Sequence, residues 1–197
     1  MSALPYIAGP LPSTRSVHSR PARALPVFDA ENLLTAHQAA LAQIAWAVAQ
    51  VPAVWHHRSP GGIIVGCEDG AWSVAENLAH LFVYEELNTL PALATLAGRG
   101  NHVCHSPRTV EFQTTQATLR EYSVADLLAQ LWAAHERLAM LARTFTTAEF
   151  TNPQVPAPNP DFLFDRSTPG WLVAKSVQHF WEHGATMQRV LLFATSS

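Results

Sequence analysis

Three histidines, one in the middle of the chain and two near its end, are the residues best suited to chemistry. His179 and His183 lie four positions apart in the segment 177–183, so on a helix both imidazoles project from the same face. If a neighbouring helix brings His80 to that face, three nitrogens form an open site for a divalent metal, with one position left for water or substrate. Imidazole ligands suit zinc, nickel or iron(II), whereas magnesium and calcium prefer oxygen.

Three further polar residues are candidates for supporting this site. Glu76 lies one turn before His80 and either orients a ligand imidazole or only forms a capping box with Ser73. His37 and His135 lie on apolar helical seams. Each is either a fourth ligand or proton shuttle, or a neutral core histidine bonded to a backbone carbonyl. Glu76 and His135 are also the weak candidates for a catalytic general base.

A second group, His102, Cys104 and His105, lies in a polar crossover segment. Its spacing is unlike that of common zinc sites. Cys104 could also act as a nucleophile, but no residue pattern indicates a lowered thiol pKa. This cluster is therefore a minor alternative to the three-histidine site.

Four long helices are predicted to position these residues. Their starts carry capping residues, and their apolar positions recur at spacings of three and four. We expect helices over about 29–51, 73–87, 123–145 and 168–193, with Pro91 breaking or kinking the second. No convincing strand pattern is present, apart from a short apolar run at 63–65. The fold class is therefore all-α, an antiparallel-type four-helix bundle with long crossover loops at 99–122 and 152–168.

The N-terminal segment differs from the rest of the chain. Residues 1–27 contain five prolines, which prevent a helix and favour an extended arm. We expect two parts: a proline-rich arm at 1–27 and a single bundle domain at 28–197.

Composition narrows the partners that we expect. The net charge of −3 gives no basic footprint for nucleic acid. No apolar run is long enough to span a bilayer, and no signal peptide is apparent. Two cysteines make no disulfide framework. We therefore expect a cytoplasmic protein with a small-molecule substrate, no nucleic-acid partner and no membrane association.

Two segments resemble motifs of the DinB/YfiT-like superfamily. The segment 72–81, Trp-Ser-Val-Ala-Glu-Asn-Leu-Ala-His-Leu, is similar to the second-helix motif, and 177–183 is similar to the last-helix motif. The resemblance covers about 29–194. It implies a four-helix bundle, a nickel or zinc ion held by His80, His179 and His183, and a homodimer. It also implies a link to thiol-dependent transferases that use bacillithiol, mycothiol or glutathione.

Three hypotheses for function follow. The first is a metal-dependent S-transferase in which the metal activates a low-molecular-weight thiol. The second is a metal-dependent amidase or esterase that uses the same site. The third is a non-enzymatic, stress-related protein that binds a metal or small molecule, because the fold alone does not decide between them.

Overall fold

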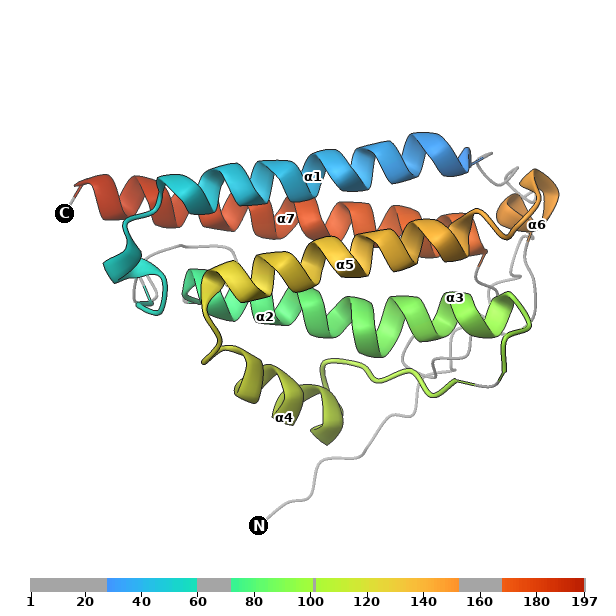
Figure 1. The fold of residues 1–197 in the computed structure, drawn as a ribbon, viewed down its shortest axis with the longest axis horizontal. Coiled ribbons are helices and arrows are strands. Elements are labelled where there is room, and N and C mark those ends of the chain that lie inside the picture. The colour runs from blue at the N-terminus through green and yellow to red at the C-terminus, as the bar shows by residue number, and fades with distance from the viewer. Residues whose placement is uncertain (1–27, 60–71, 101, 153–167, 197) are drawn as a thin grey trace, which may run out of the picture.

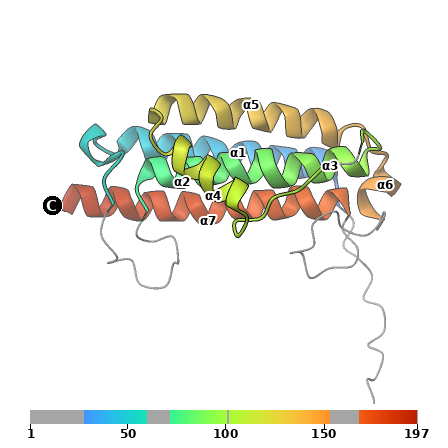
Figure 2. The same cartoon turned by 90° about the horizontal axis from the view of Figure 1, so that it is seen from below.

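The computed structural model describes residues 28–59, 72–100, 102–152 and 168–196. These residues are mostly helical and contain no strand. Four long rods pack side by side, as Figures 1 and 2 show. The predicted all-α four-helix bundle is therefore confirmed.

Three of the long helices begin at the predicted capping residues. Helix α1 (Ala30–Gln50) begins after Asp29, whose carboxylate accepts the Asn32 N–H at 2.8 Å. Helix α5 (Val124–Ala142) is capped by Ser123. Helix α7 (Pro169–Ser196) begins after Thr168, whose hydroxyl oxygen accepts the Trp171 N–H at 2.9 Å. Side-chain caps satisfy amide donors that the first turn leaves free.

The second long helical element, which we call the second rod, runs from Val74 to Leu96 and continues past Pro91 because its helical geometry changes just before the proline. Helix α2 (Val74–Tyr84) leads into a π-helical turn, η2 (Glu85–Thr89), and then into α3 (Leu90–Leu96). In a regular α-helix the Pro91 ring would clash with the carbonyl of residue 87. The wider turn avoids this clash, and the Leu87 carbonyl instead accepts the His105 N–H at 2.7 Å. Of the two outcomes predicted at Pro91, a break is therefore wrong, and the helix instead changes locally to a π-helical turn.

The four long helical elements of the bundle are not all antiparallel to their neighbours. Contacts pair His37 with Ser176 and Trp55 with Phe193, so α1 and α7 run parallel. The second rod and α5 also run parallel (Figure 1). This is possible because the chain after α3 returns along the bundle through α4 (Val110–Leu119) before α5 begins.

Helix α4 lies in a segment expected to be only a crossover. Its hydrophobic pattern is weak, but Thr109 caps it, and Phe112 and Leu119 are buried. Two shorter elements complete the described fold, η1 (Ala53–Trp55) and α6 (Thr147–Thr151).

The bundle core contains a set of buried polar side chains among its apolar ones. Large apolar residues such as Leu41, Leu78 and Phe180 are fully buried. Buried polar groups are costly unless they are hydrogen-bonded, so these side chains need an explanation by partner or function. They include His37, Asn77, His80, Glu85, Ser176 and His183.

Two glycines of α7 give a matched stability test. A Cβ at Gly170 would lie 2.8 Å from the Phe150 carbonyl oxygen and 2.7 Å from the Phe28 Cβ, whereas at Gly184 the nearest atom is 3.4 Å away. We expect Gly170→Ala to cost about 1–3 kcal/mol through overpacking. Gly184→Ala should be neutral or stabilise by up to about 1 kcal/mol through helix propensity. Urea unfolding measures both, and equal effects would contradict the packing at Gly170.

Several sequence predictions fall on residues that the structure does not describe. The arm at 1–27, the apolar run at 63–65 and Cys67 lie outside the described residues, as does most of the loop at 152–168. The domain boundary at residue 28 therefore stays a prediction. Among the described helices, none is long and apolar enough to cross a membrane.

Candidate metal centre

The two helices that carry the three histidines bring their imidazoles together. His80 on α2 and His179 on α7 face each other with their Nε2 atoms 3.2 Å apart, and the Nε2 atoms of His179 and His183 are 3.1 Å apart. One nitrogen from each residue lies within 4.8 Å of the others. Tetrahedral ligands at about 2.0–2.1 Å from zinc would lie about 3.3 Å apart. The three-histidine group could therefore hold a metal ion with little movement.

Amide oxygens on the far side of two rings fix which nitrogens face the centre. Asn77 donates its NH₂ to the Trp72 and Ser73 carbonyls, so its Oδ1 is the acceptor for His183 Nδ1 at 2.7 Å. Gln116 Oε1 lies 3.2 Å from His80 Nδ1. With protons on both Nδ1 atoms, both Nε2 lone pairs point at His179. A single proton on His179 Nε2 satisfies only one of them, whereas a divalent cation satisfies all three nitrogens.

The protonation states also suit a metal. Burial, followed by the neighbouring His183, His80 and Lys175 charges, holds the pKa of His179 well below its usual value. Burial and His80 lower the pKa of His183 to about 3. Both rings are therefore neutral at physiological pH, which is the form that binds metals.

Of the three histidines, His80 lines a cleft of about 320 Å³, together with residues of α2 and α4 and of the segments beside them. Trp72 forms part of its wall, with its ring centroid 4.9 Å from that of His80. Arg120 lies at the cleft and pairs with Glu76 at 3.8 Å. A small ligand in this cleft would lie against the His80 ring and beside Gln116. The cleft is lined by Trp72, Glu76, His80, Pro107, Gln113, Gln116, Ala117 and Arg120.

The supporting residues proposed from the sequence have different places. Glu76 forms the capping box with Ser73 and contacts Arg120, while the ligand imidazoles are oriented by Asn77 and Gln116. Of the two roles considered for Glu76, the structure therefore shows the capping box and not the orientation of a ligand imidazole.

His37 and His135 do not join the three-histidine group. They stack on each other, with ring centroids 5.0 Å apart, and their Nδ1 atoms are 3.0 Å apart. Among the described residues the group that could hold a metal comprises only His80, His179 and His183. The alternative of His37 or His135 as a fourth ligand is therefore not supported.

The crossover cluster does not form a site either. His102 Nε2 bonds the Arg99 carbonyl at 2.9 Å, and the cluster is absent from the possible metal groups of the described chain. Cys104 is buried, and burial raises the pKa of its thiol to about 11. A thiol of this kind is a poor nucleophile at neutral pH.

Sequence reasoning missed two residues of the centre. Asn77 lies three positions before His80, and its spacing alone could have placed it on the same face. Gln116 had no such signal, because the helix that carries it was not predicted.

Comparison with known proteins places this geometry in a family. A family model described as the DinB superfamily matches residues 23–187. The chain belongs to the DinB superfamily. The match includes His80, His179 and His183, and proteins of this superfamily are often metal-binding. No curated protein matches the chain at a significant level.

Solved structures similar to this DinB-superfamily chain share its fold at low identity. One is an uncharacterised protein from Escherichia coli UTI89, with a TM-score of 0.59 and 14% identity over 84% of this chain and 93% of that one. Another is the colibactin self-resistance protein ClbS in complex with double-stranded DNA. Its TM-score is 0.59, with 15% identity over 85% of this chain and 97% of that one.

The second comparison corrects one prediction from composition. The sequence analysis excluded a nucleic-acid partner because the chain has no basic surplus. ClbS, a protein of the same fold, is in complex with double-stranded DNA. The exclusion is therefore wrong, because net charge summed over a whole chain does not describe the charge of one face.

Proposed function

We propose that this protein is a metal-dependent enzyme that joins a low-molecular-weight thiol to an electrophile. The observation that carries the proposal is the convergence of three imidazole nitrogens beside an open cleft. His80, His179 and His183 would hold nickel or zinc. When bound, the ion would act as a Lewis acid that lowers the pKa of a thiol at the site.

The residues of the cleft favour an acidic thiol. The Arg120 side chain is half exposed, its pair with Glu76 is long, at 3.8 Å, and its Nε donates to the exposed Glu121 carboxylate at 3.2 Å. Exposed ion pairs of this kind contribute little to stability, so the guanidinium can turn to a carboxylate of an incoming ligand at low cost. Glutathione, mycothiol and bacillithiol are thiols of low molecular weight, and those with carboxylates would gain from Arg120. Because such thiols are kept reduced in the cytoplasm, the proposal places the protein there.

Hydrolysis of an amide or ester is the weaker alternative, because the cleft offers no unengaged general base among its described residues. Glu76 accepts the Ser73 N–H at 2.8 Å through one oxygen and pairs with Arg120 through the other. His135 lines a different groove. A thiol brings its own nucleophile and needs no such base.

The test is a thiol-addition assay with nickel- and zinc-loaded protein, using monochlorobimane, which becomes fluorescent when a thiol adds to it. We expect turnover with at least one of glutathione, mycothiol and bacillithiol. Arg120→Gln should raise KM about tenfold for a carboxylate-bearing thiol, the loss of one charged contact. It should leave 2-mercaptoethanol unaffected.

Arg108→Gln is the matched control, because Arg108 is exposed and does not line the cleft. Hydrolysis of 4-nitrophenyl acetate that depends on metal but not on thiol would support the hydrolase instead. If the metal-loaded protein turned over neither substrate, the enzymatic proposal would be wrong.

A further inference from the structure

A buried carboxyl group begins a chain of polar contacts that the metal centre does not use. Glu85, in the π-helical turn, is fully buried. Its Oε1 accepts the Ser176 hydroxyl and, at 3.4 Å, the Thr89 hydroxyl. Its Oε2 has no hydrogen-bond partner among the described residues. An acid in this position is costly to keep ionised, so its presence calls for a function.

The chain continues through two imidazoles to the surface of the bundle. Ser176 Oγ lies 2.9 Å from His37 Nε2, and His37 Nδ1 lies 3.0 Å from His135 Nδ1. An ionised Glu85 can only accept, so Ser176 donates to it and accepts from His37 Nε2–H. His37 Nδ1 then accepts from His135 Nδ1–H. This order leaves the Nε2 lone pair of His135 as the outer end of the chain.

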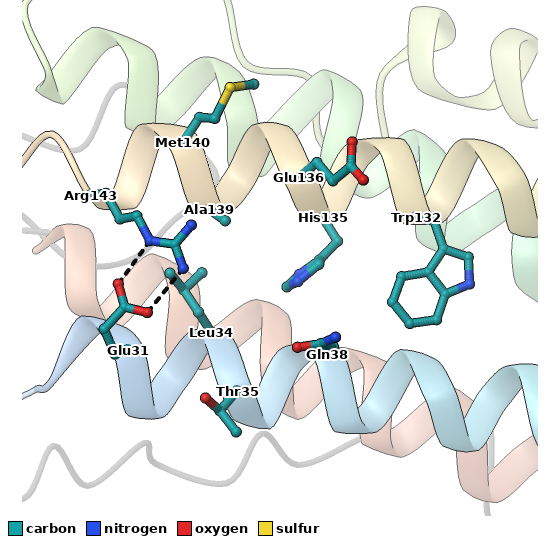
Figure 3. A pocket seen from close by; sticks show the side chains of 10 residues that line it. All are labelled: Glu31, Leu34, Thr35, Gln38, Trp132, His135, Glu136, Ala139, Met140 and Arg143. Carbon is teal, nitrogen blue, oxygen red and sulfur yellow. Dashed lines mark hydrogen bonds and ion pairs between the residues drawn. The ribbon is translucent and has the colours of Figure 1, made fainter.

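That outer end meets a groove of about 480 Å³ between α1 and α5. Figure 3 shows His135 directed from α5 toward α1, with Trp132 to one side and the Glu31–Arg143 ion pair at the far end. This pair is bidentate, with N–O distances of 2.8 and 2.9 Å. The groove therefore offers a proton acceptor and an aromatic ring to one ligand, and its guanidinium is held by Glu31.

We propose that this groove binds a small phenol, whose hydroxyl proton passes to His135 and is taken up at the inner end of the chain by Glu85. The aromatic ring of the ligand would contact Trp132 and the exposed Met140 side chain. The site is separate from the metal centre and does not depend on its occupancy.

The proton movements balance without another reactant. The phenol O–H bond breaks as an N–H bond forms at His135 Nε2, and each donor along the chain passes its proton inward. The last proton forms an O–H bond on Glu85. The chain then points outward, and His135 Nε2–H donates to the phenolate, which is a charge-assisted hydrogen bond.

Electrostatics favour this transfer. Burial raises the pKa of Glu85 to about 7, which is in the range of acidic phenols. Burial and His135 lower the pKa of His37 to about 3, so His37 relays a proton without keeping it. The negative charge moves from the dry core to an open groove, where water solvates it.

Other charged groups on the surrounding helices are accounted for. Glu136 lines the groove on α5, and Glu31 on α1 is paired with Arg143. Glu86, next to Glu85, pairs with Arg137 of α5. Burial and the Glu85 charge raise the pKa of the Tyr84 hydroxyl, so Tyr84 stays neutral. Lys175 of α7 precedes Ser176 in the sequence. None of these groups belongs to the hydrogen-bonded chain, so none should replace Glu85 as the proton acceptor.

The experiment titrates metal-free protein with 4-nitrophenol at about pH 8, where the free probe and Glu85 are both ionised. Calorimetry in two buffers of different ionisation enthalpy gives the protons taken up per probe bound. We expect about one proton for the wild type and about none for Glu85→Gln, in which position 85 is already neutral. The absorbance of the bound probe should show phenolate in both proteins.

The Glu86→Gln variant is the matched control, because it removes a neighbouring charge outside the chain, and it should take up one proton like the wild type. Equal uptake by the wild type and Glu85→Gln would overturn the proposal, as would the absence of saturable binding. If Glu85→Gln does not fold, Ser176→Ala breaks the same chain and should also lose the uptake; full uptake there would refute the relay.

Discussion

Replacing His179 with alanine is expected to abolish stoichiometric binding of nickel or zinc. His179 Nε2 lies 3.2 Å from His80 Nε2 and 3.1 Å from His183 Nε2. Its loss removes the nitrogen that contacts both of the others and leaves only two imidazole ligands. Removal of groups that only orient a ligand costs about 10–100-fold in metal affinity, so loss of a ligand should cost more than about 100-fold. Elemental analysis after dialysis, followed by calorimetric titration, measures the effect.

The control for this experiment is His135→Ala. His135 also lies in the bundle and contacts another histidine, but it lines the groove between α1 and α5 and not the metal cleft. This variant should keep one metal per chain. Full metal occupancy in His179→Ala would refute the ligand assignment.

Acid should unfold the metal-free protein more readily than a bundle of this size without buried histidines. The pKa of His37 is lowered from 6.5 to about 3, mainly by burial. Between these values the unfolded chain binds a proton that the folded protein does not, so stability falls as the pH drops below about 6.5. Each such histidine contributes about 1.4 kcal/mol per pH unit, and His183 and His179 add to it when no metal is bound.

Glu85 acts in the opposite direction. Its pKa is raised from 4.5 to about 7, so between these values the folded protein holds a proton that the unfolded chain has released. Its contribution therefore falls as the pH rises through this window. Because the histidines outnumber this carboxyl, the net stability should still fall with acid, enough to remove several kcal/mol over about two pH units.

Urea unfolding followed by far-UV circular dichroism from about pH 4.5 to 7.5 tests both contributions. Glu85→Gln removes the opposing titration and should steepen the loss of stability by about 1.4 kcal/mol per pH unit. A wild-type profile that is flat below about pH 6.5 would contradict the neutral, buried state of His37.

The parts of the fold that were predictable depend on local signals. Asp29, Ser73, Ser123 and Thr168 cap their helices as expected, because capping is a contact between residues three or so positions apart. The convergence of His80 with His179 followed from a resemblance that couples two distant motifs. Spacing alone placed only His179 and His183 on one face.

The parts that were missed depend on contacts between distant residues. The π-helical turn at 85–89 accommodates Pro91, which cannot bond the Leu87 carbonyl, while His105 of the crossover does, and no local pattern encodes that contact. Helix α4 has a weak apolar pattern, so Gln116 could not be placed beside His80. The contact of His37 with His135 depends on the packing of α1 against α5, so no local pattern indicated that the two rings meet.

The π-helical turn also constrains how this protein can change by insertion or deletion. A turn of this kind holds one residue more than an α-helical turn, so deleting any one of residues 85–89 would remove the extra residue and bring the Pro91 ring against the carbonyl four positions before it. Everything beyond it would then rotate by about 100° relative to α2. Leu90 and Leu93, now buried, would swing away from their neighbours while His80 stayed in place. The rotation of α3 about the helix axis relative to α2 therefore depends on the number of residues in this turn. Insertions and deletions here should be selected against even where substitutions are tolerated.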